Sequence, residues 1–162
     1  MKKTAVFTII VIMLTVSCGV YTFSPSALGG IKSTAIPLFE NRTSEGGLSE
    51  DLTDKLSRAF IDDNTLRLVP ESRADAVLRG AVVSYELEAY TYDQNEVVSE
   101  YIVRVGLDIG FFEKNNAKVI WEEKKMSNWG TYNSITETED DGKERALNKL
   151  VEDILNKTVK GW

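Results

Sequence analysis

The strongest constraint on the fold is a segment, Val97–Phe112, with apolar residues at alternate positions. Side chains of a β-strand point to the two faces of a sheet in turn, so this period of two predicts a strand with one apolar face. The apolar face carries Tyr101, Val103, Val105, Leu107, Ile109 and Phe111, and the opposite, mixed face carries Glu100, Arg104, Gly106, Asp108 and Gly110. A sheet built on this strand needs a second layer to cover its apolar face.

Further strands are predicted on both sides of this segment. Asp75–Tyr92 is extended and alternating, and a short turn then leads into Val97–Phe112 as in a hairpin. After another turn, Ala117–Trp129 forms a third antiparallel strand. A first strand is expected over Ile31–Phe39, and Pro37, which has no N–H, indicates its end or an edge position.

Two apolar stripes at helical spacing predict the covering layer. The first helix is expected over Ser49–Ile61, with Ser49 as its N-cap and a stripe of Leu48, Leu52, Leu56, Ala59 and Phe60. The second helix follows the acidic stretch Glu137–Asp141 and ends near Lys160–Gly161, with a stripe of Ala146, Leu147, Leu150, Val151, Ile154, Leu155 and Val159. Leu66–Val69 is a short strand candidate beside these elements.

The expected fold class is therefore α+β. Two helices pack on one face of a four-stranded, mostly antiparallel sheet, in the order β-α-β-β-β-α. The result is a two-layer sandwich, and the second face of its sheet is mixed and partly exposed.

The N-terminus has the features of a lipoprotein signal peptide. The basic start Met1–Lys3 precedes an apolar stretch, residues 4–16, that is too short to span the roughly 30 Å of a membrane's hydrocarbon layer. The stretch leads to Cys18, the only cysteine of the chain, and the junction resembles a lipobox. We therefore expect residues 1–17 to be a signal peptide and Cys18 to carry a diacylglycerol and an N-acyl chain, which together anchor a protein stably.

The rest of the chain divides into a short tether, residues 18–30, and a single domain, residues 31–162. Gly19 stands where inner-membrane sorting favours Asp, which predicts a lipid-anchored protein of the outer membrane that faces the periplasm. Removal of the signal peptide takes away two lysines and changes the net charge from −6 to −8. Such an acidic domain is not expected to bind nucleic acid.

The composition argues against an enzyme. The chain has no histidine, which removes the commonest general base and metal ligand, and its one cysteine is assigned to lipid. No phosphate-binding glycine loop, HExxH pattern or EF-hand pattern is present. The densest acids, at Glu122–Glu123 and Glu137–Asp141, are interpreted as solvated surface and as a helix start. We expect no catalytic residue, no metal and no cofactor besides the covalent lipid.

Short motifs along residues 18–160 follow the order seen in the LPS-assembly lipoprotein family, LptE. The start Cys18–Phe23 resembles the Cys-Gly and aromatic opening of that family, and Leu48–Leu52 is similar to its first helix start. Glu100–Val103, Val119–Trp121 and the later Tyr132 resemble its central and following strands. The resemblance implies two helices on a four-stranded sheet. It also implies a non-catalytic subunit of the outer-membrane lipopolysaccharide translocon, which plugs a β-barrel partner, LptD, assists its assembly and aids lipopolysaccharide insertion into the outer leaflet.

Contact with lipopolysaccharide would require cations for the phosphates of lipid A. The candidates are Arg104, Lys114, Lys118, Lys124 and Lys125. Contact with the barrel is the safer expectation for an acidic domain, and the loops at Asn41–Gly47 and Asp93–Val97 are expected to take part.

Two other functions stay open at this stage. Ala35–Thr43 also resembles the Pro-Phe-x-Asn opening of other envelope lipoproteins, which would make the chain a periplasm-facing adaptor of the curli-secretion or peptidoglycan-synthase-activator kind. A self-contained lipid carrier would need a large apolar cavity, and the two helices are expected to fill that space.

Overall fold

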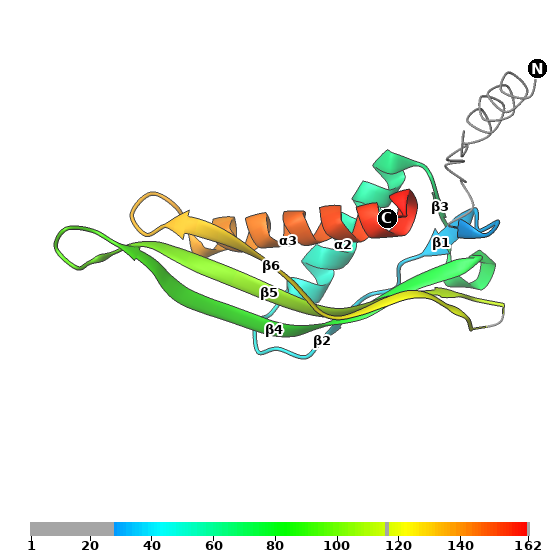
Figure 1. Ribbon diagram of the computed structural model, residues 1–162, viewed down its shortest axis with the longest axis horizontal. Helices are drawn as coiled ribbons and strands as arrows, with labels where there is room; N and C mark the ends of the chain where they lie inside the picture. Colours follow the sequence, from blue (N-terminus) through cyan, green and yellow to red (C-terminus); the bar gives the residue numbers. More distant parts are fainter. Residues whose placement is uncertain (1–27, 116, 162) are drawn as a thin grey trace, which may run out of the picture.

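The computed structural model covers residues 28–115 and 117–161 and has two layers, a six-stranded sheet and two helices on one of its faces (Figure 1). The elements follow in the order β1 (Ser33–Ala35), β2 (Glu40–Asn41), α2 (Leu48–Asp63), β3 (Arg67–Leu68), β4 (Ala76–Tyr92), β5 (Val98–Glu113), β6 (Val119–Asn133) and α3 (Glu139–Leu155). A 3-10 turn, Glu71–Arg73, precedes β4, and a π-helix, Asn156–Lys160, continues α3. The expected signal peptide and Cys18 lie outside the described residues.

The three long strands form an antiparallel meander, as predicted. β5 lies between β4 and β6, with Val103 opposite Leu87 on one side and Gly130 on the other. β4 and β5 begin and end within one residue of the predicted segments. β6 continues to Asn133, beyond its predicted end, and Tyr132 in this extension stacks on Tyr101 of β5, with 5.4 Å between the ring centroids.

The expected four-stranded, mostly antiparallel sheet is wrong in detail, because the N-terminal strands are short and parallel. β1 pairs in parallel with β3 and β4, and β2 pairs in parallel with β4. The predicted strand Ile31–Phe39 is split, since the chain leaves the sheet after Ala35 around Pro37, which cannot donate a ladder hydrogen bond. Parallel neighbours need a long crossover, which α2 supplies between β1 and β3.

Both helices bury the predicted stripes against the sheet. From α2, Leu48, Leu52, Leu56 and Phe60 are buried, and from α3, Ala146, Leu147, Leu150, Val151 and Ile154. They meet the apolar face of β5, where Val103, Val105, Leu107 and Phe111 have no exposed surface. Burial of each leucine side chain contributes roughly 1.5–3 kcal/mol, so this layer contact dominates the stability of the fold.

The two helices begin differently. The N-cap of α2 is Gly47, at φ 78°. The prediction of Ser49 as the N-cap is wrong, because Ser49 already belongs to the helix and its hydroxyl donates to the Glu50 side chain. Thr138 caps α3 through a capping box with Asp141. No described helix has the length and apolar character needed to cross a membrane.

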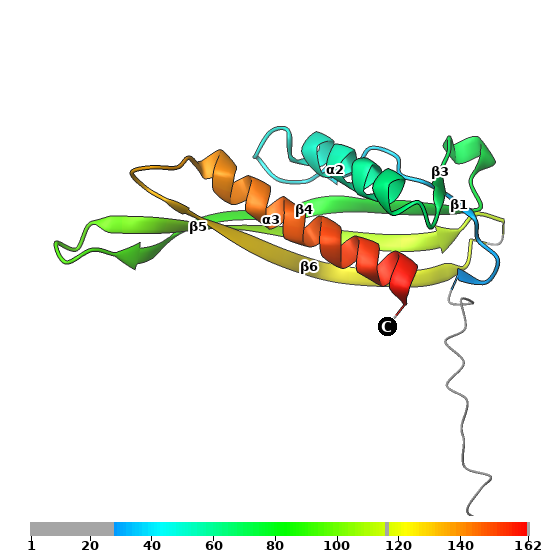
Figure 2. The ribbon, with the colours of Figure 1, turned by 90° about the horizontal axis from the view of Figure 1, so that it is seen from above.

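The hairpin of β4 and β5 projects beyond the helices at the end away from the C-terminus (Figure 2). The start of β5 lies beside the connection from β6 to α3, where the Ser134 N–H donates to the Ser99 carbonyl, and the turn Asp93–Val97 extends beyond this connection (Figure 2). The other loop expected to form an interface, Asn41–Gly47, does not reach this tip. It is tied to the start of α3 by the ion pair of Glu45 with Lys143.

β6 and α3 approach each other most closely at two glycines. A Cβ atom at Gly130 would clash with the carbonyl oxygen of Gly142 and lie 2.6 Å from the Cβ of Arg145. The helix can therefore lie this near the strand only because position 130 has no side chain.

We expect Gly130→Ala to lower the free energy of unfolding by about 1–3 kcal/mol, because backbone must move to make room for the methyl group. Urea denaturation followed by circular dichroism measures this change. Gly46→Ala is the matched control, since a Cβ there meets nothing within 4 Å. Equal stability of the two variants would contradict the close packing of α3 on β6.

Candidate functional site on the open face of the sheet

Of the described elements, α2 and α3 both lie on one face of the sheet, and neither covers the opposite face (Figure 1). It carries the predicted mixed face of β5, with Arg104, Gly106 and Asp108 in its middle. Near β1 a small apolar cluster of Ala35, Ala74 and Val77 covers it. Beyond this cluster the face is available to a partner or ligand.

A hollow of about 410 Å³ lies in the middle of the open face. Its floor is Gly106, which stands between Ser84 of β4 and Ser127 of β6. Small residues at one level of three neighbouring strands leave this depression. Its other lining residues are Val83, Glu86, Arg104, Asp108 and Lys125.

Both neighbours of β5 carry a bulge close to this hollow. β4 shifts its register between Val82 and Ser84, and β6 shifts opposite the β5 segment 107–109. In the second bulge Lys125 adopts φ 55°, and its N–H donates to Asp108 Oδ1 at 3.0 Å. A lysine in the left-handed region is strained, and this hydrogen bond from the neighbouring strand helps to hold it there.

A second hollow of about 200 Å³ shares Asp108 and is lined by ion pairs. Arg42 Nη2 lies 2.7 Å from Glu40, and Lys124 Nζ lies 2.8 Å from Glu122. The hydrogen bond and negative charge of Glu122 raise the pKa of Lys124. The charges of this hollow therefore largely neutralise one another.

The cations of the first hollow are less engaged. Arg104 Nε is 3.9 Å from Glu86 Oε2, which is a loose ion pair. No described residue forms a hydrogen bond or an ion pair with the ammonium group of Lys125. These two side chains are the ones most available to an anionic ligand.

The predicted cationic residues thus lie at three separate places. Arg104, Lys124 and Lys125 line the two adjoining hollows on the open face. Lys114 instead donates to the carbonyl oxygens of Glu71 and Ser72, which commits it to the turn before β4. Lys118 lines another hollow, beside Ile31 and Val119.

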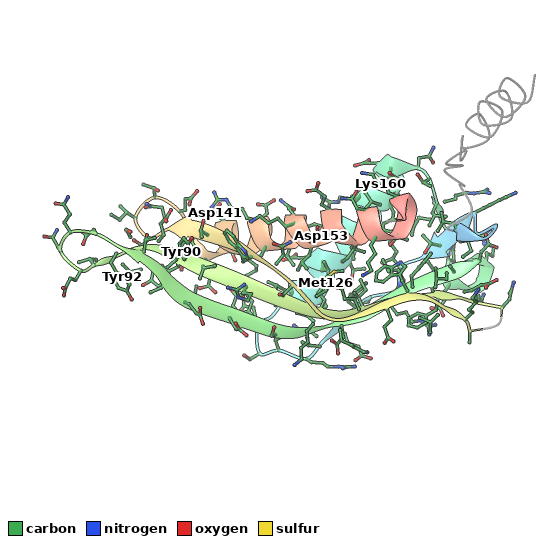
Figure 3. The ribbon with its side chains drawn as sticks, in the orientation of Figure 1. Tyr90, Tyr92, Met126, Asp141, Asp153 and Lys160 are labelled. Carbon is green, nitrogen blue, oxygen red and sulfur yellow. The ribbon has the colours of Figure 1, made fainter. Side chains whose placement is uncertain are left out.

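Two aromatic side chains that approach each other across β5 were not identified as site residues from the sequence. Trp129 lies opposite Arg104, and its ring centroid is 6.5 Å from that of Tyr90, which the projecting hairpin carries (Figure 3). Lys149 of α3 places its ammonium 3.9 Å from the Trp129 ring centroid. The alternation of β6 puts Trp129 on the face of Ser127, and that signal could have found it.

Within residues 28–115 and 117–161, no group of three or more His, Cys, Asp or Glu side chains could hold a metal ion. The hollows are lined by charged, hydroxyl and small side chains. Such a surface suits a polar macromolecular partner or an anionic headgroup rather than an acyl chain.

The family model described as LptE, Lipopolysaccharide-assembly, matches residues 31–158. No curated protein matches the chain. Of the solved structures, a DUF330-family protein from Xanthomonas campestris is similar, with 13% identity and a TM-score of 0.60 over 80% of this chain and 85% of that one. A minor lipoprotein from Acinetobacter baumannii is 15% identical, with a TM-score of 0.53 over 80% of this chain and 92% of that one. A lipoprotein from Caulobacter crescentus is 18% identical, with a TM-score of 0.52 over 84% and 92%. At these identities the likeness concerns the fold.

We expect Asp108→Ala to lower the free energy of unfolding by about 1 kcal/mol, because the bulge at Lys125 loses the acceptor of its N–H. Asp108→Asn is the control, since its side chain keeps an oxygen at the same place. Urea denaturation of both variants measures the effect. An equal loss in both would show that the charge of Asp108, rather than its hydrogen bond, matters.

Proposed function

The chain belongs to the LptE family of lipopolysaccharide-assembly proteins, and we propose that it is the lipid-anchored subunit of an outer-membrane lipopolysaccharide translocon. In this role it plugs a β-barrel partner of the LptD kind, assists the assembly of that barrel and aids the insertion of lipopolysaccharide into the outer leaflet. Its family is one of envelope lipoproteins that are not enzymes and use no cofactor. We extend this to the chain itself, and assign it no catalytic step.

The open face supports the role of a plug. The lumen of a wide β-barrel is polar, so a protein that lies in it needs a polar surface and a rigid structure. The helix layer packs tightly on one side of the sheet, while the other side presents paired charges and serines. We therefore propose that the open face lies against the barrel wall.

Contact with lipopolysaccharide is assigned to the cations of the open face. Arg104 and Lys125 have the loosest ties to acidic neighbours, and Lys124 is beside them. A guanidinium group binds a phosphate through two parallel hydrogen bonds. Lys114 is left out of this site, because two backbone carbonyls already occupy its ammonium group.

The position of the protein depends on its lipid. We propose that residues 1–17 are removed, that Cys18 is acylated, and that residues 18–30 tether the domain, residues 31–162, to the periplasmic side of the outer membrane. With so short a tether, the domain stays close to the lipid surface.

Replacement of the acylated cysteine tests the anchor. We expect Cys18→Ser to abolish palmitate incorporation in growing cells, because no thiol remains to accept the lipid. The matched control is Ser44→Ala, at an exposed position that leaves the N-terminus intact. Acylation of the Cys18→Ser protein would overturn the assignment.

Co-purification tests the partner. We expect the tagged full-length protein, extracted from envelopes with detergent, to bring down a large outer-membrane barrel in stoichiometric amount. Arg104→Glu should reduce its yield several-fold, because it places a negative charge beside Glu86 at the centre of the open face. Arg58→Glu, an equal charge change at an exposed position of α2, should leave the yield unchanged.

The partners identified by mass spectrometry decide between functions. A peptidoglycan synthase in place of the barrel would favour the envelope adaptor. A barrel whose yield falls equally in both charge variants would keep the translocon subunit but contradict docking through the open face.

A further inference from the structure

The sheet has two outer edges, and they are protected to different degrees. β1 and β2 pair with β4 only as far as Val82, and the Arg42 N–H then donates to the Val82 carbonyl. Beyond that point, no described strand pairs with the outer side of β4. An unpaired strand edge of this kind is a template for another strand.

The edge of β6 shows which backbone groups point outward. The Trp129 carbonyl accepts a hydrogen bond from Lys149, at 2.8 Å, and so points away from β5. Opposite residues of an antiparallel pair either bond each other or both point away. Arg104, opposite Trp129, therefore directs its backbone groups to β4, where it faces Glu86.

The carbonyl two residues further along β6 also points outward. The Thr131 carbonyl accepts a hydrogen bond from Arg145, at 2.6 Å, which orients Glu88 toward β5. Because consecutive residues of a strand alternate, Leu87 and Ala89 direct their N–H and C=O groups away from the sheet. These groups have no described partner.

Within the part of the chain that the structure describes, the edge of β6 is closed but this edge of β4 is open. Arg145 and Lys149 of α3 occupy two outward carbonyls of β6, whereas no side chain in that part binds the outward groups of Leu87 or Ala89. The open stretch runs from Tyr85 to Ala89 and ends at the bulge that contains Tyr90.

Acidic side chains predominate around this edge, although the Lys143 ammonium lies 5.9 Å from the Tyr85 ring centroid. Glu86 and Glu88 are exposed, and among the described residues they form a single ion pair, the loose one from Glu86 to Arg104. Glu139 at the start of α3 accepts a hydrogen bond from the Tyr85 hydroxyl on the same strand. Exposed Leu87 adds an apolar contact. An incoming strand that carries lysine or arginine is the complement of this surface.

We propose that the β4 edge, Tyr85–Ala89, binds an extended, basic segment of a partner protein as an additional strand. Main-chain hydrogen bonds to Leu87 and Ala89 give the affinity, and Glu86 and Glu88 select the positive charge. This site adjoins the open face, since Glu86 also lines the first hollow there, but its main-chain groups lie on the outer edge of β4 and its test does not depend on the proposed translocon role.

A designed peptide tests the site with the full-length protein in detergent. The probe is a fluorescent, end-blocked peptide of roughly eight residues, with alternating valine and threonine and two of the threonines replaced by lysine. Its controls carry glutamate at the lysine positions, or one proline at the centre. We expect anisotropy to show at least about tenfold tighter binding of the lysine peptide than of either control. Bound peptide should also slow hydrogen exchange at the amides of Leu87 and Ala89.

Two variants separate edge pairing from other binding. Ala89→Pro removes one outward N–H and leaves the adjacent pairing of Glu88 intact, so it should weaken binding about tenfold. Glu88→Lys should invert the preference between the lysine and glutamate peptides, while Glu152→Lys, exposed on α3, should not.

If Ala89→Pro unfolds the hairpin, the charge reversal still decides the matter. Absence of binding by any peptide would mean that Glu86 and Glu88 close this edge, and it would overturn the proposal. Binding that protects no amide of β4 would overturn it as well. None of these results depends on a barrel, so they leave the translocon proposal untouched.

Discussion

Burial of the apolar face of β5 beneath α3 and α2 is the contact on which the rest of the structure depends. The residues that face the helices, from Val103 to Phe111, are almost without exposed surface. Because the period of a strand is two, a shift by one residue would exchange this face for Arg104, Gly106 and Asp108. The register of β5 is therefore strongly fixed, and the same register determines which side chains line the open face.

The open face is hollow for a reason that lies on β5 as well. Two of its outward positions near the middle, 106 and 110, are glycine, and the neighbouring strands place serines beside Gly106. Bulges in β4 and β6 close to this level turn the strands and bring Lys125 toward Asp108. The result is a polar depression near Trp129. The apolar residues on the helix side of β5 stay buried.

Much of this arrangement could be predicted from the sequence, and the rest depends on contacts between distant segments. The long strands and both helices repeat a pattern over many residues, so Val97–Phe112 and the stripe from Ala146 were found almost at their observed bounds. β1, β2 and β3 have two or three residues each, too few to show a period, and their parallel pairing depends on how α2 crosses over. Lys114 and Lys125 are likewise far apart, because Lys114 follows the end of β5 whereas Lys125 lies in the middle of β6. Tyr90 and Trp129 approach each other across β5 beside a bulge in β4 that no local pattern reveals.

The two edges of the sheet show how one helix can influence association as well as stability. α3 lies along β6, and Arg145 and Lys149 reach over the edge to bind carbonyls that would otherwise attract another strand. The contact that allows this approach is the pair Gly130 and Gly142, so the packing of the core and the closure of the edge have one cause. On the other side of the sheet, α2 does not extend as far as the part of β4 that leads to the hairpin turn (Figure 2). A strand from another protein would pair with that edge and extend the sheet. If no strand binds there, the negative charges of Glu86 and Glu88 are what prevents pairing with other chains.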